Sequence, residues 1–282
     1  MPASIEVYGK LGCQEGKSYF SMQTEAFFSF SSQTNILHRT NLATGEDTAF
    51  EIKDFVFEAR CVGTLCGKGK LYVTGGRSDS FGEEVNWVMI IDTLRDFSVV
   101  QTCNMGTSRY SHAAAFHGGF LYVIGGQNTD KVLDSCERLD LTNCKWEPVE
   151  PLPKASSDLS VTVVEATASL FALGGFTKFK FSSRHNLIQR LSLTTQSWDL
   201  LKVKLPYPDY SMPCFTGEQS QVYFISRDSL FVFNPITSVV SERQQLDLEV
   251  LKSSSGPSLY SRGALYYSNL RQGVVSVTLG NL

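Results

Sequence analysis

Apolar residues between Arg109 and Pro153 occur in short alternating runs that turn residues separate, a pattern typical of short β-strands. The first two runs cover residues 113–116 and 120–124, and His117-Gly118-Gly119 lies between them. A tight hairpin is predicted there, because the central residues of such a turn need positive φ.

Two more strands are expected in the same unit. The adjacent glycines Gly125-Gly126 end the second run and allow the backbone to turn sharply and to pack where a Cβ would clash. The polar residues 127–134 then lie outside the core, residues 135–140 alternate as a third strand, and Trp146 opens a fourth. Because a tryptophan buries a large area, Trp146 is expected to anchor this outer strand against the neighbouring sheet.

The second strand of this unit recurs along the chain. LYVIGG from Leu121 matches LYVTGG from Leu71 and LFALGG from Leu170, and more weakly AFFSFS from Ala26, VYFISR from Val222 and LYYSNL from Leu265, at steps of 45, 50, 49, 52 and 43 residues. A turn residue after each third strand gives a second series: Asn41, Asp92, Asp140, Ser192, Asn234 and Thr278. Aromatic residues give a partial third series: Phe50, Phe97, Trp146 and Trp198. Six copies of one four-stranded unit are therefore predicted.

The copies resemble the kelch repeat, in which a tyrosine precedes a Gly-Gly pair and a tryptophan follows some twenty residues later. Tyr122, Gly125-Gly126 and Trp146 carry the resemblance. It implies an all-β fold, a six-bladed kelch-type β-propeller. The second, third and fourth copies have the Gly-Gly pair, and other residues take its place in the rest: Phe30-Ser31, Ser226-Arg227 and Asn269-Leu270.

The ends of the chain are expected to close the ring. A four-stranded sheet cannot bury both of its faces alone, so neighbouring copies must stack and the array must close or be capped. The last copy has three strands, and the alternating residues Ile5–Tyr8 precede the first copy. Residues 1–10 are expected to pair with residues 274–279, the alternative being a frayed N-terminus. The chain is expected to be a single domain. Its first five blades are expected at about residues 17–53, 57–104, 108–150, 157–204 and 210–246, and its sixth blade combines residues 255–280 with residues 4–8.

Composition narrows the class of partner and the compartment. The 282 residues carry a net charge of −3, which gives no electrostatic reason to expect a nucleic acid or an anionic membrane as partner. Seven scattered cysteines without a C-x-x-C pair predict buried reduced thiols rather than a zinc site. The N-terminus lacks the apolar run of a signal peptide and no stretch is long enough to span a bilayer, so a cytoplasmic protein is expected.

Catalysis is the weaker hypothesis. The segment GCQEGKS from Gly12 lacks the glycine spacing of a phosphate loop. Some kelch propellers are copper oxidases, but such a site needs two histidines and tyrosines that converge, and this chain has four scattered histidines: His38, His112, His117 and His185. We expect no catalytic, metal or cofactor site. The alternative is a propeller enzyme that acts on a sugar or another small molecule at the central channel.

Binding through loops is the function that propeller geometry favours. The segments that enter each inner strand and those that follow each second strand emerge on one face, and the resemblance implies that polar and arginine side chains there contact acidic or polar peptides. The residues expected to contact a partner are Arg60, Arg77, Asp79, Arg109, Tyr110, Gln127, Asn128, Asp158, Tyr210 and Arg227. The arginines could form forked bonds to carboxylates or phosphates. A solvated polar rim is the alternative.

One loop differs from its counterparts. The segment KFKFSSRH, from Lys178 to His185, is long and alternates basic with aromatic residues. Lys178 and Phe179 are candidate partner contacts, because an exposed aromatic ring offers apolar surface. Alternatively, the alternation extends two strands into a longer hairpin, with Phe179 and Phe181 turned onto the blade.

The sequence thus predicts a non-catalytic scaffold or adaptor that binds a protein or peptide, including acidic segments. Many kelch-family members are adaptors of cullin ubiquitin ligases, a role that needs a BTB domain and a helical segment before the propeller. Neither is found in these 282 residues. Cytoskeletal or trafficking scaffolding, or a detached interaction domain of a larger protein, is therefore the better expectation.

Overall fold

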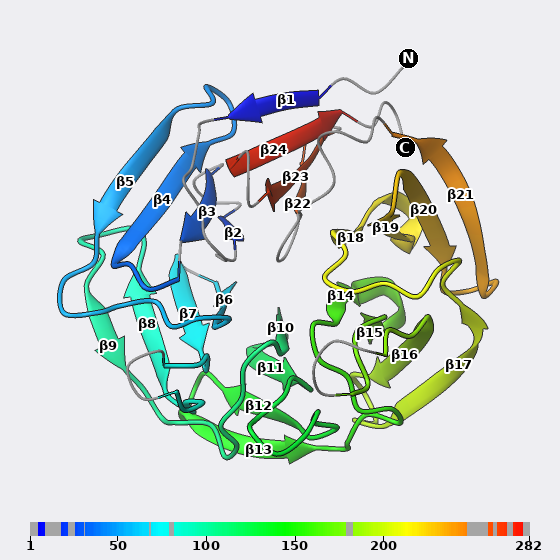
Figure 1. The fold of residues 1–282 in the computed structure, drawn as a ribbon, viewed down its shortest axis with the longest axis horizontal. Coiled ribbons are helices and arrows are strands. Elements are labelled where there is room, and N and C mark those ends of the chain that lie inside the picture. The colour runs from blue at the N-terminus through cyan, green and yellow to red at the C-terminus, as the bar shows by residue number, and fades with distance from the viewer. Residues whose placement is uncertain are drawn as a thin grey trace.

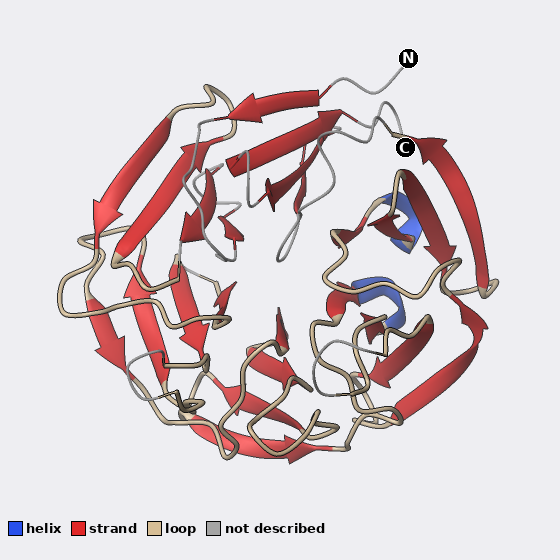
Figure 2. Ribbon diagram, viewed as in Figure 1, coloured by secondary structure: helices blue, strands red, loops and turns tan. Residues whose placement is uncertain are grey.

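The chain folds as an all-β propeller, in which small sheets follow one another around a ring (Figure 1; Figure 2). The computed structural model describes residues 5–8, 18–21, 26–30, 32–67, 69–78, 82–178, 183–246, 259–261, 264–269 and 273–278. Among these described residues, two short 3-10 helices, η1 (Glu165–Thr167) and η3 (Glu218–Ser220), lie between strands.

Five of the sheets have four antiparallel strands each, in chain order from the inner strand to the outer strand. Their strands are β2 (Ser18–Ser21), β3 (Ala26–Phe30), β4 (Ile36–Asn41) and β5 (Asp47–Glu51); β6 (Val62–Leu65), β7 (Lys70–Thr74), β8 (Val88–Asp92) and β9 (Val99–Gln101); β10 (Ala113–His117), β11 (Phe120–Ile124), β12 (Cys136–Asp140) and β13 (Lys145–Val149); β14 (Ser160–Val164), β15 (Ser169–Leu173), β16 (Leu187–Ser192) and β17 (Trp198–Lys204); and β18 (Cys214–Thr216), β19 (Val222–Ser226), β20 (Ser229–Asn234) and β21 (Val239–Gln245). We number these sheets blades 1 to 5.

A further four-stranded sheet contains strands from both ends of the chain. Its order is β1-β24-β23-β22, and its strands are β1 (Ile5–Tyr8), β22 (Leu259–Ser261), β23 (Ala264–Asn269) and β24 (Gly273–Thr278). Strand β1 runs antiparallel to β24, with Ile5 opposite Val277 and Tyr8 opposite Val274. Figure 1 shows this sheet between blade 5 and blade 1.

The repeated sequence marks correspond to equivalent structural positions. The six segments related to LYVIGG form β3, β7, β11, β15, β19 and β23. The tight hairpin is confirmed between β10 and β11, where Gly118 and Gly119 have φ of 57° and 86°. The predicted turns are confirmed in all five numbered blades. The turn residues whose side-chain oxygens accept a bond from a backbone N–H two or three residues later are Asn41, Asp92, Asp140, Ser192 and Asn234.

Apolar side chains fill the boundaries between neighbouring blades. At the boundary of blades 1 and 2, Phe30 stacks on Phe57 and Phe50 stacks on Phe97, each with ring centres 4.0 Å apart. Trp146 packs in the core between blades 2 and 3, as predicted. Each sheet therefore buries an apolar face only against its neighbour, which is why the blades depend on the ring for stability.

The Gly-Gly pairs join successive blades. The N–H groups of Gly76, Gly126 and Gly175 donate to backbone carbonyls of the following blade: Arg109, Ser156 and Asp209, at 2.9, 2.9 and 2.8 Å. At the first glycine of each pair, a Cβ would lie 2.3–2.4 Å from the same carbonyl oxygen. The close packing predicted for these glycines is thus a contact between blades.

The cysteines only partly follow the expectation of buried thiols. Four of them are buried, Cys61, Cys66, Cys136 and Cys214. Cys103 and Cys144 are exposed, so the prediction is wrong for these two. The reason is their position, because Cys103 follows the outer strand β9 and Cys144 ends the turn between β12 and β13. Cys13 lies outside the described residues.

Candidate functional site

Isolated β-bridges hold the predicted binding loops together on one face. In blade 2, Arg77 bridges both Ala59, ahead of the inner strand, and Glu84, ahead of the third strand. The same arrangement joins Tyr110, Gln127 and Val132 in blade 3 and joins Ser157, Phe176 and Arg184 in blade 4. We call the surface of these loops, together with residues 207–211 and 226–228 of blade 5, the loop face.

A belt of backbone hydrogen bonds links the loop face from blade to blade. The N–H of Ser111 donates to the carbonyl of Arg60 at 3.2 Å, that of Asp158 donates to Ser111 at 2.8 Å, and that of Ser211 donates to Asp158 at 2.8 Å. These four residues all have positive φ, between 44° and 57°. Because positive φ is strained for residues other than glycine, the repetition indicates that the surrounding packing imposes it. The belt fixes the loops around the ring.

Exposed arginines lie over aromatic rings on the loop face. The guanidinium carbon of Arg77 lies 5.9 Å from the ring centre of Tyr110, and that of Arg227 lies 3.7 Å from Tyr207. Both distances are within the range of cation–π attraction. Arg77 and Tyr110 belong to different blades, so this pair also spans a blade boundary.

A third arginine, Arg184, was missed by the sequence prediction. Its guanidinium carbon lies 4.5 Å from the ring centre of Tyr210 and 5.8 Å from that of Phe176. The two rings contact each other, with centres 4.5 Å apart. Arg184 was inside the long loop that the sequence singled out, but the Gly-Gly spacing did not mark it. Its signal is its place just before the third strand of blade 4, equivalent to Glu84 in blade 2.

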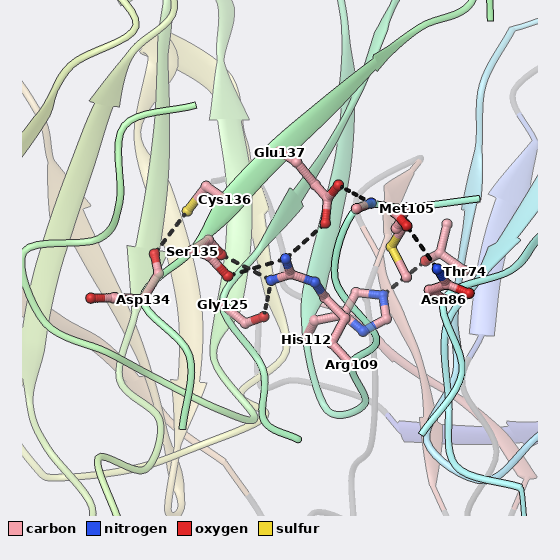
Figure 3. Close-up of polar contacts among 11 residues, drawn as sticks. Thr74, Asn86, Met105, Arg109, His112, Gly125, Asp134, Ser135, Cys136 and Glu137 are labelled. Carbon is pink, nitrogen blue, oxygen red and sulfur yellow. Dashed lines mark hydrogen bonds and ion pairs between the residues drawn. The ribbon is translucent and has the colours of Figure 1, made fainter. Parts of the chain in front are cut away.

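Arg109 is not part of the accessible surface, so its prediction as a partner contact is wrong. Its side chain is fully buried, and its guanidinium donates to the carbonyls of Gly125 and Ser135 at 2.7 and 2.9 Å (Figure 3). It also pairs with Glu137 at 2.8 Å. The reason is that two adjacent side chains point in different directions: Arg109 points into its own blade, whereas Tyr110 next to it lies under Arg77.

The other predicted contacts differ in accessibility. Gln127 is buried, so a partner cannot contact it. Tyr110 is only 6% exposed, and its ring mainly supports the Arg77 side chain that lies over it. Arg60 is half-buried and its Nη1 donates to Ser111 Oγ at 3.3 Å. Asp158 is half-buried and Lys178 is exposed. Asp79, Phe179 and Phe181 lie outside the described residues.

Polar side chains also fix the loop that follows the Gly-Gly pair of blade 3. The Oδ1 of Asn128 accepts bonds from the N–H groups of Asp130 and Lys131, at 3.1 and 3.0 Å. Thr129 then donates through its hydroxyl to Glu84 of blade 2, at 2.6 Å. Burial raises the pKa of Glu84, but the bonds from Thr129 outweigh it and the pKa is lowered overall. Asn128 therefore shapes the loop, and Glu84 stays ionised beside Arg77.

A pocket that small or apolar groups mostly line lies among residues of the inner strands β6, β10, β14 and β18 and the segments just ahead of them. Its lining residues are Val62, His112, Ala113, Ala114, Leu159, Ser160, Val161, Ser211, Met212 and Cys214. His112 is buried, and its Nε2 lies 2.8 Å from the Thr74 hydroxyl (Figure 3). This hydrogen bond gives His112 a role in the packing between blades 2 and 3.

Comparison with known protein families identifies the family of this chain. Residues 26–240 match the family model of the KLHDC2/KLHL20/DRC7 Kelch-repeats domain. The chain belongs to the kelch-repeat family. The match covers three strands of blade 1, all of blades 2 to 4 and most of blade 5, so the kelch resemblance is confirmed.

Curated kelch proteins show the same relationship over shorter regions. The chain is 34% identical to human Kelch-like protein 15 over 90 residues, which are 32% of this chain and 15% of that protein. It is 31% identical to Kelch-like protein 41a of Danio rerio over 109 residues, 39% of this chain and 18% of that protein. It is 28% identical to Kelch-like protein 25 of Xenopus tropicalis over 179 residues, 60% of this chain and 29% of that protein.

These kelch relatives are much longer than the region they share with this chain, which covers less than a third of each of the three.

Within the described ranges, no helix is long and apolar enough to cross a membrane.

Proposed function

We propose that this kelch domain is a non-catalytic interaction module whose loop face binds a protein or peptide segment that carries carboxylates. The observation that supports the proposal most is the set of three exposed arginines, Arg77, Arg184 and Arg227, each lying over an aromatic ring. They come from blades 2, 4 and 5, so a bound segment would cross the channel mouth to reach all three.

The ring contacts make these arginines suited to binding. An aromatic ring beneath a guanidinium restricts its motion, so less conformational entropy is lost when a ligand binds. The planar guanidinium can then form two parallel bonds to one carboxylate. The backbone belt keeps the loops at fixed spacing, which favours a partner of defined shape over a loosely held polyanion.

A peptide array tests this function. Full-length protein is applied to immobilised peptides in which the number of Asp and Glu residues varies, and the peptides that bind best are then measured in solution. Replacing Arg77, Arg184 and Arg227 by Ala together is expected to weaken binding at least tenfold. Each Lys variant keeps the charge but loses the fork, and we expect an intermediate loss.

The matched control is Arg95→Ala. The Arg95 side chain is 83% exposed but belongs to the turn between β8 and β9, away from the loop face. This variant removes the same charge and should bind as the wild type does. Equal binding by the triple variant and the wild type, or an equal loss in Arg95→Ala, would show that the loop face is not the binding surface.

We also infer that the ring has six blades and is closed by the N-terminal strand. The antiparallel register of β1 with β24 supports this proposal, because it gives the last three strands a fourth. Deleting residues 1–10 is then expected to lower the melting temperature, and adding a peptide of residues 1–10 to restore it. A peptide with Asp in place of Ile5 and Val7 is the control. An unchanged melting temperature after the deletion would contradict closure.

A cytoplasmic location is part of the same proposal. Within the described residues the six cysteines are thiols, and four of them are buried in the blades. Reduced cysteines are usual for proteins kept in a reducing compartment. Imaging of the tagged full-length protein tests the location.

A further inference from the structure

Two exposed cysteines meet at the boundary between blades 2 and 3. Cys103 follows β9, the outer strand of blade 2, and Cys144 lies between the two outer strands of blade 3. They are 41 positions apart in the sequence, yet the Sγ of Cys103 lies 2.5 Å from the carbonyl oxygen of Cys144. Since neither side chain is buried, reagents in solution can reach both.

The local contacts hold the two residues together on both sides. The hydroxyl of Thr102 lies 2.5 Å from Cys144 Sγ, and the indole Nε1 of Trp146 donates to the carbonyl of Cys103 at 2.8 Å. The N–H of Cys144 donates to the carbonyl of Asp140 at 2.9 Å, which fixes the turn. Both backbones are therefore anchored, and the thiols do not need a rearrangement of the blades to meet.

The two thiols also interact with each other, and this makes them unequal. Burial raises the pKa of Cys144, but hydrogen bonds with Cys103 and Thr102 outweigh it and lower the pKa overall. The bond with Cys144 is the main cause that raises the pKa of Cys103. Burial raises the pKa of Cys136 and of Cys214 to about 12, so these thiols are inert by comparison.

We propose that Cys103 and Cys144 are a redox modification site, at which a peroxide converts the thiol pair into a reversible disulfide between blades 2 and 3. Cys144 is the attacking residue and Cys103 the resolving residue. The buried cysteines take no part, because a peroxide does not reach them.

The chemistry balances with hydrogen peroxide as the oxidant. The Cys144 thiolate attacks one peroxide oxygen, the O–O bond breaks, and the products are a sulfenic acid on Cys144 and hydroxide, which takes up a proton to become water. The Cys103 sulfur then attacks the Cys144 sulfur, so that the S–S bond forms and the S–O bond breaks. The leaving hydroxide combines with the Cys103 proton as a second water. Two electrons pass from the two sulfurs to the peroxide, and a dithiol reductant reverses the bridge.

The bridge would connect the end of β9 in blade 2 to the turn between β12 and β13, the outer strands of blade 3. It encloses β10, β11 and β12, so it would restrict the unfolded chain over a loop of some 40 residues. An increase in melting temperature of roughly 5 °C is expected for a bridge of this kind in a chain of this size. The loop face is formed by other residues, so the proposal does not depend on the proposed function.

Peptide mapping tests the site directly. The native full-length protein is treated with hydrogen peroxide, its remaining thiols are blocked, and it is digested without reductant. A peptide that links Cys103 to Cys144 is expected in the monomer, and dithiothreitol should remove it. Links between other cysteines, links between two chains, or a Cys103–Cys144 link that forms only in denaturant would overturn the proposal.

Two serine variants separate the roles of the cysteines. In Cys103→Ser, the sulfenic acid on Cys144 cannot be resolved, so labelling of Cys144 by dimedone should rise several-fold over the wild type. In Cys144→Ser, labelling of Cys103 should stay low. Cys136→Ser is the buried control and should bridge as the wild type does, and circular dichroism checks that each variant is folded. Equal labelling in the two exposed variants would contradict the assigned order.

Discussion

Arg109 and Glu137 form an ion pair that is buried within blade 3, with 2.8 Å between Nη2 and Oε1 and side-chain exposures of 1% and 9%. The other carboxylate oxygen of Glu137 accepts the N–H of Gly106 at 2.7 Å, so the carboxylate holds both Arg109 and the chain three residues before it. The pair joins the entry to the inner strand with the third strand of the same blade. It therefore holds the loop face in place from beneath.

Arg109→Ala is expected to lower the free energy of unfolding by about 3–5 kcal/mol, because it leaves the Glu137 carboxylate buried without its partner. Arg109→Lys should lose less, since one ammonium keeps the charge but cannot reach all the acceptors of the guanidinium. Urea denaturation measures both. Arg95→Ala, in an exposed turn, should change stability by less than about 0.5 kcal/mol. A similarly small effect of Arg109→Ala would mean that the ion pair does not stabilise the blade.

Gly125 and Gly118 provide a matched comparison for the contact between blades. Their φ values are 58° and 57°, so an alanine would have to adopt a left-handed φ at either place. A Cβ at Gly125 would lie 2.4 Å from the carbonyl oxygen of Ser156, whereas a Cβ at Gly118 meets no atom within 4 Å. The surrounding space therefore distinguishes the two substitutions.

Gly118→Ala is expected to cost about 1 kcal/mol from positive φ alone. Gly125→Ala should cost at least about 2 kcal/mol more, because blade 4 must move away from blade 3 to make room. Thermal and urea unfolding of both variants give the difference. If the two alanine variants were equally stable, the Gly-Gly pair would be needed only for its backbone conformation and not for the joint between blades.

The repeat architecture could be predicted from the sequence because its marks lie where local chemistry is decisive. Asp140 ends a strand and its side chain accepts a bond from the N–H of Thr142, and this chemistry recurs in each numbered blade. A Gly-Gly pair likewise marks a place where the backbone of the next blade is in contact. Such positions depend on a few neighbouring residues, so spacing alone located them.

The binding residues were harder to predict, because spacing does not say which way a side chain points. Arg109 and Tyr110 are adjacent, but the first points into its own blade and the second lies under Arg77. Arg184 lies in a loop whose length differs from its counterparts, so counting from the Gly-Gly pair did not align it with its equivalent in blade 2, Glu84. The exposure of Cys144 could have been inferred, since it falls within the turn that begins at Asp140.

His185 gives a prediction of pH dependence. It follows Arg184 in the sequence, and its Nδ1 accepts the N–H of Leu187 at 3.2 Å. Nε2 therefore carries the proton and donates to Ser156 Oγ at 2.9 Å. Burial, helped by the charge of Lys154, lowers the pKa of His185 from 6.5 to about 4 in the folded state. Protonation at Nδ1 would break the bond from Leu187.

The sign follows from the two states. Between pH 6.5 and about 4 the unfolded chain binds a proton at His185 and the folded chain does not, so this contribution to stability is complete above pH 6.5 and is lost as the pH falls. His185→Asn keeps an acceptor for the Leu187 N–H but does not titrate, so its stability should fall less steeply over this range. Lys154→Met removes the nearby positive charge and should raise the pKa of His185. The loss of stability on acidification should then be smaller, as it is for His185→Asn. Denaturant unfolding at several pH values and an NMR titration of the imidazole measure both effects, and a His185 midpoint near 6.5 in the folded protein would contradict the prediction.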